Sequence, residues 1–169
     1  MKISDATYKQ LNNLLQKSFD CNARADNFAY NIDYQRYPNM GNIYHHSFAH
    51  LFPALADQIS ALMIKLNARP MRLAINQYAT EYLDMKDLFV DNDIMAEEYR
   101  QMIRETIDMA DLHDDYEVRI EMENLLVQFT PYLKQCDVWR AEAERYKEDM
   151  VNFDVHFEEL TTFIPIKKD

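Results

Sequence analysis

Residues 42–66 have the sequence NIYHHSFAHLFPALADQISALMIKL, and the predicted fold follows chiefly from the pattern of these residues. Its apolar residues recur every three or four positions, which is the period of one buried face of an α-helix. The face consists of Phe48, Phe52, Leu55, Ile59 and Leu62. Pro53 lies inside the stretch and removes one backbone hydrogen bond, so we expect a kinked helix there.

The flanking sequence predicts three further long helices with similar apolar spacing. The first runs from a cap at Ser4 or Asp5 to about Ile32, and residues 33–41, DYQRYPNMG, form a loop. The third long helix covers about residues 94–112, and the fourth covers about residues 116–147 with a bend at Pro131. We assign no structure to the tail, residues 150–169.

The connection between the second and third long helices is long, spanning residues 67–93. The sequence NARP at residues 67–70 ends the second helix, and a shorter helix is predicted from about Met71 to Tyr82. A crossover of this length allows the two long helices to run parallel. The predicted fold is therefore an all-α four-helix bundle over residues 1–149, with a short helix in the crossover, followed by the C-terminal tail.

Composition and charge exclude several other folds and functions. Gly41 is the only glycine, so nucleotide loops such as GxGxxG are excluded and hairpin-rich β folds are disfavoured. The formal net charge is −11 without a basic arm, so we expect no nucleic-acid partner. Cys21 and Cys136 form no CxxC pair, and we find no signal peptide or membrane-length apolar run. We expect a cytoplasmic protein that does not bind a membrane.

With this order of helices, the chain resembles the ferritin-like superfamily, specifically the Dps-type mini-ferritins. The local match covers residues 54–70, where ALADQISA and a later NARP resemble the family's DEIAER segment and GGxP turn. The resemblance implies a hollow homo-oligomer that oxidises Fe(II) and stores iron, with a ferroxidase centre of two histidines, an aspartate and a glutamate. Asp57 matches that aspartate, whereas Ala61, Asn42 and Ala29 stand at or near the places of the other three ligands.

A histidine cluster in the second helix is the candidate site that the residues themselves indicate. His46 and His50 are four residues apart, so both imidazoles lie on one helix face, and Asp57 follows two turns later. Imidazole and carboxylate ligands suit transition metals, so these three residues are our metal-ligand candidates. About 10 Å of helix rise separates His50 from Asp57, so the site needs a carboxylate from elsewhere, such as Asp20 or Asp26. The alternative is that the histidines are ordinary surface or interface side chains.

Two functions of different classes follow from these features. The first is a mini-ferritin-like cage subunit that binds and oxidises Fe(II) and stores iron, with acidic residues of the third and fourth helices lining an inner wall. The second is a ferritin-like structural or interaction protein that has lost the metal site. A helical adaptor that binds a basic partner also fits the charge. The sequence contains no Glu-x-x-His, which a di-iron site inside the bundle requires.

Overall fold

The start of the first helix is fixed by Ser4. This residue is the N-cap of helix α1 (Asp5–Tyr34), and its hydroxyl oxygen accepts a hydrogen bond from the Thr7 amide at 3.1 Å. The same hydroxyl donates to Asp115 Oδ2 at 2.8 Å, and Asp115 is the N-cap of the last long helix. The predicted cap is confirmed, and it also joins the beginnings of two long helices that are far apart in sequence.

The computed structural model describes residues 1–168, and over these residues the protein is all-helical, without a β-strand. The all-α class predicted from the sequence is therefore confirmed. The elements after α1 are α2 (Pro38–Ile43), the π-helix η1 (Tyr44–Ala49), α3 (Leu51–Lys65), α4 (Met85–Leu112), α5 (Tyr116–Arg145) and α6 (Met150–His156).

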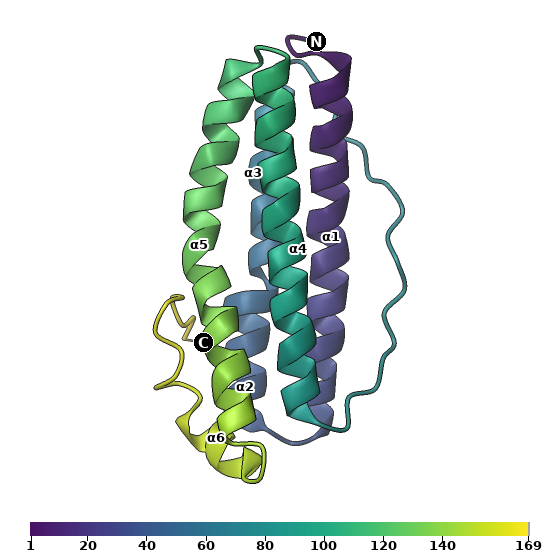
Figure 1. Cartoon of the computed structure of the whole chain (residues 1–169). Helices are drawn as coiled ribbons and strands as arrows, with labels where there is room; N and C mark the ends of the chain where they lie inside the picture. Colours follow the sequence, from purple (N-terminus) through teal and green to yellow (C-terminus); the bar gives the residue numbers. More distant parts are fainter. Residues whose placement is uncertain (169) are drawn as a thin grey trace.

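Figure 1 shows α1, α3, α4 and α5 side by side. Helices α1 and α5 run away from the end of the molecule at which the N-terminus lies, whereas α3 and α4 both run toward it. Helix α4 packs against α1 and α5, and α1 also packs against α3. A short turn joins α4 to α5, while the long crossover carries the chain back along the molecule between α3 and α4 (Figure 1).

Aromatic side chains fill the space between these long elements. Trp139 of α5 is fully buried, and its ring packs against Tyr44, Phe48, Phe89 and Phe157 with centroids 5.1–6.0 Å apart. Aromatic pairs at such distances add to the stabilisation that comes from burying apolar surface. Since these rings come from η1, α4, α5 and the residues after α6, the core connects segments from most of the chain.

The crossover between α3 and α4 differs from the prediction. It contains no helix between Asn67 and Asp84, so the short helix predicted from Met71 to Tyr82 is wrong. Helix α4 also begins earlier than predicted, because the Asp84 side chain caps it by accepting a hydrogen bond from the Lys86 amide at 2.8 Å. The crossover is therefore a non-helical segment that runs along α1 (Figure 1).

Polar side chains of α1 explain why the crossover is not helical. They bond the backbone or side chains of residues 71–82 in succession along the helix. The α1 residues that do so are Asn12, Gln16, Asp20, Asn27, Asn31 and Gln35. Asn31 makes two such bonds, accepting from the Tyr82 amide at 2.8 Å and donating to the Thr80 carbonyl at 3.0 Å. Backbone groups that a helix would satisfy internally are satisfied here by another helix's side chains.

Asn31→Ala is expected to loosen the end of the crossover. The substitution removes the bonds to Thr80 and Tyr82, at a cost of about 1–3 kcal/mol in the free energy of unfolding. Hydrogen exchange should become faster at the Tyr82 amide. Asn27→Ala removes only one bond to the crossover, at 3.1 Å, and serves as the control with a smaller effect. Equal exchange rates in the parent and in Asn31→Ala would contradict this role.

Pro53 lies in the first turn of α3. Because η1 precedes α3 directly, the missing N–H of proline leaves a carbonyl of η1 without that donor. The irregularity comes just before, where the helix changes from π to α at His50. By length and composition alone, the continuous stretch Pro38–Lys65 contains an 18-residue segment that is apolar enough to cross a membrane. Of that segment, 56% is buried inside the protein.

The C-terminal region packs onto the core. After α6, residues 157–168 form a segment that we call the C-terminal strap. Phe153, Phe157 and Ile164 of this region are buried in the hydrophobic core. Near its end, the Lys167 amide donates a hydrogen bond to Ser47 Oγ at 2.8 Å. The strap therefore ends on η1, next to the histidines of that element.

Candidate functional site

The π-helix η1 places three histidines next to one another. A π-helix closes with i→i+5 hydrogen bonds, so residues four and five positions apart stand at neighbouring places on successive turns. His50, directly after η1, therefore lies beside both His45 and His46. In an α-helix only His46 would share a face with His50, which is why α-helical spacing did not indicate His45. The available sequence signal was three histidines within six residues, closely followed by Pro53.

The three imidazole rings are close to one another. The ring centroids of His45 and His46 are 4.9 Å apart, with the planes nearly parallel at 18°. The His50 ring stands steeply inclined to both, with its centroid 4.9 Å from that of His45 and 5.6 Å from that of His46. His45 and His46 are partly buried and His50 is exposed, so solutes can reach these three side chains. We call them the histidine cluster.

Charged groups from α1 and from the C-terminal strap lie near the histidine cluster. Burial raises the pKa of Asp26 on α1, while the charges of His45 and His50 act in the opposite direction. Burial also lowers the pKa of His50 below its usual value, and the neighbouring charges of His45, His46 and Lys167 lower it further. A lowered pKa keeps the imidazole neutral at neutral pH, and the neutral form is the one that binds metals.

The structure brings together part of the ligand set predicted from the sequence. His46 and His50 are neighbours, but Asp57 is exposed on α3, about 10 Å further along the helix axis from His50. Asp20 is bonded to the crossover and not to the histidines, because it accepts a hydrogen bond from the Tyr78 hydroxyl at 2.6 Å. The other α1 carboxylate considered, Asp26, has a pKa that the charges of His45 and His50 lower while burial raises it.

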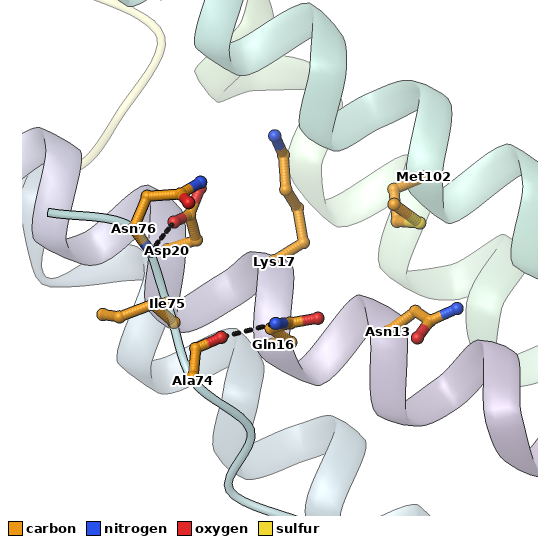
Figure 2. Close-up of a pocket in the computed structure, with 8 residues that line it drawn as sticks. All are labelled: Asn13, Gln16, Lys17, Asp20, Ala74, Ile75, Asn76 and Met102. Carbon is orange, nitrogen blue, oxygen red and sulfur yellow. Dashed lines mark hydrogen bonds between the residues drawn. The ribbon is translucent and has the colours of Figure 1, made fainter.

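A cleft of about 280 Å³ lies between α1, α4 and the crossover (Figure 2). Its lining residues are Asn13, Gln16, Lys17, Asp20, Ala74, Ile75, Asn76 and Met102. Figure 2 shows Gln16 and Asp20 bonded to the crossover, and Lys17 Nζ lies 2.9 Å from Glu98 Oε2. Gln16 and Asp20 are thus used to hold the crossover on α1, and Lys17 pairs with α4, so we take the histidine cluster as the candidate site.

The two cysteines are buried and do not contribute a nucleophile. Burial raises the pKa of Cys21 to about 12, and it also raises that of Cys136 well above its usual value. A nucleophilic cysteine needs an accessible thiolate, which such a pKa disfavours at neutral pH. Cys136 Sγ instead accepts a hydrogen bond from the Asn92 side chain at 3.3 Å.

The acidic residues considered as an inner wall are all exposed in the single chain. They are Glu98, Glu105, Asp108, Glu117, Glu121 and Glu123. Glu98 forms ion pairs with Lys17 at 2.9 Å and with Arg24 at 3.6 Å, and Glu123 lies 3.7 Å from Arg119. In the single chain, these residues therefore form part of the solvent-exposed surface of α4 and α5.

Comparison of the chain with protein-family models and with curated proteins finds no match. Within residues 1–168, no group of three or more His, Cys, Asp or Glu side chains is arranged to hold a metal ion as the side chains stand. The candidate site is therefore defined by its own geometry, which consists of three adjacent imidazoles on a π-helical turn with one carboxylate nearby.

Proposed function

We propose that this chain is a ferritin-like four-helix-bundle protein. The arrangement of the long helices supports this class, since α3 and α4 run in the same direction and are joined by a long crossover (Figure 1). A single long crossover is characteristic of ferritin-like bundles, whereas up-down-up-down bundles have only short turns. The match of residues 54–70 to mini-ferritin segments supports the same class.

Within this class we propose that the chain binds and oxidises Fe(II) and stores iron as part of a cytoplasmic homo-oligomer. The histidine cluster is the observation that carries this proposal, because imidazole nitrogens suit iron and the rings are open to solvent. Oxygen or peroxide takes the electrons that Fe(II) gives up. The exposed carboxylates of α4 and α5 provide an acidic surface on which cations gather.

The second candidate function is a ferritin-like structural or interaction protein without metal chemistry. One observation favours it, namely that the part of the chain described by the structure does not arrange three donor side chains around one ion. Asp57, the residue that matches a mini-ferritin ligand, also stands apart from the histidines. In this case the helical scaffold is retained and its surface serves subunit or partner contacts.

Aerobic loading with Fe(II), followed by size-exclusion chromatography, separates these two functions. Iron and protein are measured in the same fractions. Many irons per chain that elute with a large assembly are expected for a storage cage. A large assembly without iron supports the structural protein, and a small species without iron contradicts iron storage.

His46→Ala combined with His50→Ala should abolish saturable Fe(II) binding. Both side chains are at least partly exposed, so the helical content measured by circular dichroism should be unchanged. His113→Ala is the matched control, because His113 is an exposed histidine beyond the end of α4. If the double variant binds Fe(II) as the parent does, these histidines are not the iron ligands.

A further inference from the structure

We propose that His45, His46 and His50 form a mononuclear site for a divalent transition metal of the Zn²⁺ type. This inference goes beyond iron storage because it concerns a single ion held within one chain, whether or not the chain assembles into a cage. Asp57 on α3 is not one of its ligands.

The spacing of the three rings fits the ligands of one ion. An imidazole nitrogen binds Zn²⁺ at about 2.0–2.1 Å, so the ring centroids of two histidine ligands at a tetrahedral ion stand roughly 5 Å apart. The three centroid distances in the histidine cluster are 4.9, 4.9 and 5.6 Å. The backbone of η1 therefore already holds the three rings at the separation that a shared ion requires.

Rotation of the rings is the change that metal binding needs. A histidine ring centroid lies close to the line of the Cβ–Cγ bond, so rotation about χ2 redirects the ring nitrogens while the centroid stays nearly in place. This torsion is broad in histidine, so the rotation meets little resistance. His45 and His46 are stacked at 18°, and turning one ring out of this stack allows the nitrogens to converge.

Three imidazoles leave the fourth position of a tetrahedral ion to water, as in zinc sites that have three protein ligands. His50 is exposed, so water can reach that position. Helix α1 packs against η1 and holds this turn against the bundle.

Lys167 at the end of the C-terminal strap opposes a cation at this site. Its backbone is anchored by the bond to Ser47 Oγ at 2.8 Å, which keeps its positive charge beside η1. Lys167→Met should therefore tighten metal binding by about two- to tenfold. Lys168→Met removes a charge from the adjacent residue of the strap and is the matched control, with a smaller effect.

Titration of the full chain with Co²⁺, followed by visible absorption, tests the site directly. We expect one Co²⁺ per chain with the intense bands of a four-coordinate ion, and displacement of that ion by Zn²⁺. His45→Ala should weaken binding by on the order of tenfold or more, because loss of a second-shell partner alone weakens metal sites by about 10–100-fold. Binding by His45→Ala as tight as that of the parent overturns the proposal.

Asp57→Asn tests the carboxylate that the sequence suggested as a ligand. It should leave Co²⁺ binding unchanged, because Asp57 lies about 10 Å further along the helix axis than His50. Weaker binding in Asp57→Asn overturns the assignment of the site to the three histidines. The substitution nearly preserves side-chain size, and circular dichroism of the variant confirms that helicity is retained.

The result for this site is separable from the result for iron storage. A chain that binds one Co²⁺ through His45 but accumulates no iron supports the mononuclear site and removes the storage function. A parent chain that stores iron but binds no Co²⁺ at the histidine cluster overturns the site and leaves the storage function standing.

Discussion

Trp139→Ala is expected to lower the free energy of unfolding by about 3–5 kcal/mol. The Trp139 side chain is fully buried, and its ring contacts Tyr44 and Phe48 of η1 as well as Phe157 of the C-terminal strap. Its removal leaves a cavity between three separate elements, which cannot close without moving η1. Urea unfolding followed by circular dichroism measures the loss.

Two further substitutions on α5 calibrate the Trp139 result. Val127 is 72% exposed on the same helix, so Val127→Ala should change the free energy of unfolding by no more than about 0.5 kcal/mol. Trp139→Phe retains an aromatic ring but loses the hydrogen bond from the indole N–H to Thr161 Oγ1 at 3.2 Å, so an intermediate loss is expected. If Trp139→Ala lowers the free energy of unfolding no more than Val127→Ala does, this ring does not hold a central place in the core.

Gln135→Leu is expected to release the C-terminal strap and to lower the free energy of unfolding by about 1–3 kcal/mol. The Gln135 side chain is fully buried on α5 and donates to the Leu160 carbonyl at 2.8 Å. Its carbonyl oxygen accepts from the Thr162 and Phe163 amides at 2.9 and 3.0 Å. Leucine preserves the volume but leaves these strap groups without their partner, so hydrogen exchange at both amides should become much faster.

Gln128→Leu is the matched control for this prediction. Gln128 lies seven residues before Gln135 on the same helix, but its side chain is exposed. The substitution should leave both the exchange rates of the strap and the free energy of unfolding nearly unchanged. Hydrogen exchange compares the Thr162 and Phe163 amides of Gln135→Leu with those of the parent. Equal exchange rates would show that the apolar residues of the strap hold it in place without Gln135.

The long helices were predictable because their signals are local. Apolar residues at three- and four-residue spacing indicated α1, α3, α4 and α5, and Ser4 marked the beginning of α1. The crossover was not predictable in this way, because its hydrogen bonds come from α1 side chains 47 to 59 residues away in sequence. A periodic pattern within residues 71–82 carries no information about a distant row of amide side chains.

The candidate site was predictable only in part, for a similar reason. Helical spacing by itself paired His46 with His50, and composition by itself established the all-α class. His45 joins them only because the turn is π-helical. Asp26 and Lys167 lie near the histidines only because α1 and the C-terminal strap pack around that turn. Helix periodicity is a property of residues a few positions apart. The packing of Tyr44 and Phe48 from the π-turn against Trp139 is instead a tertiary contact, which only the folded chain provides.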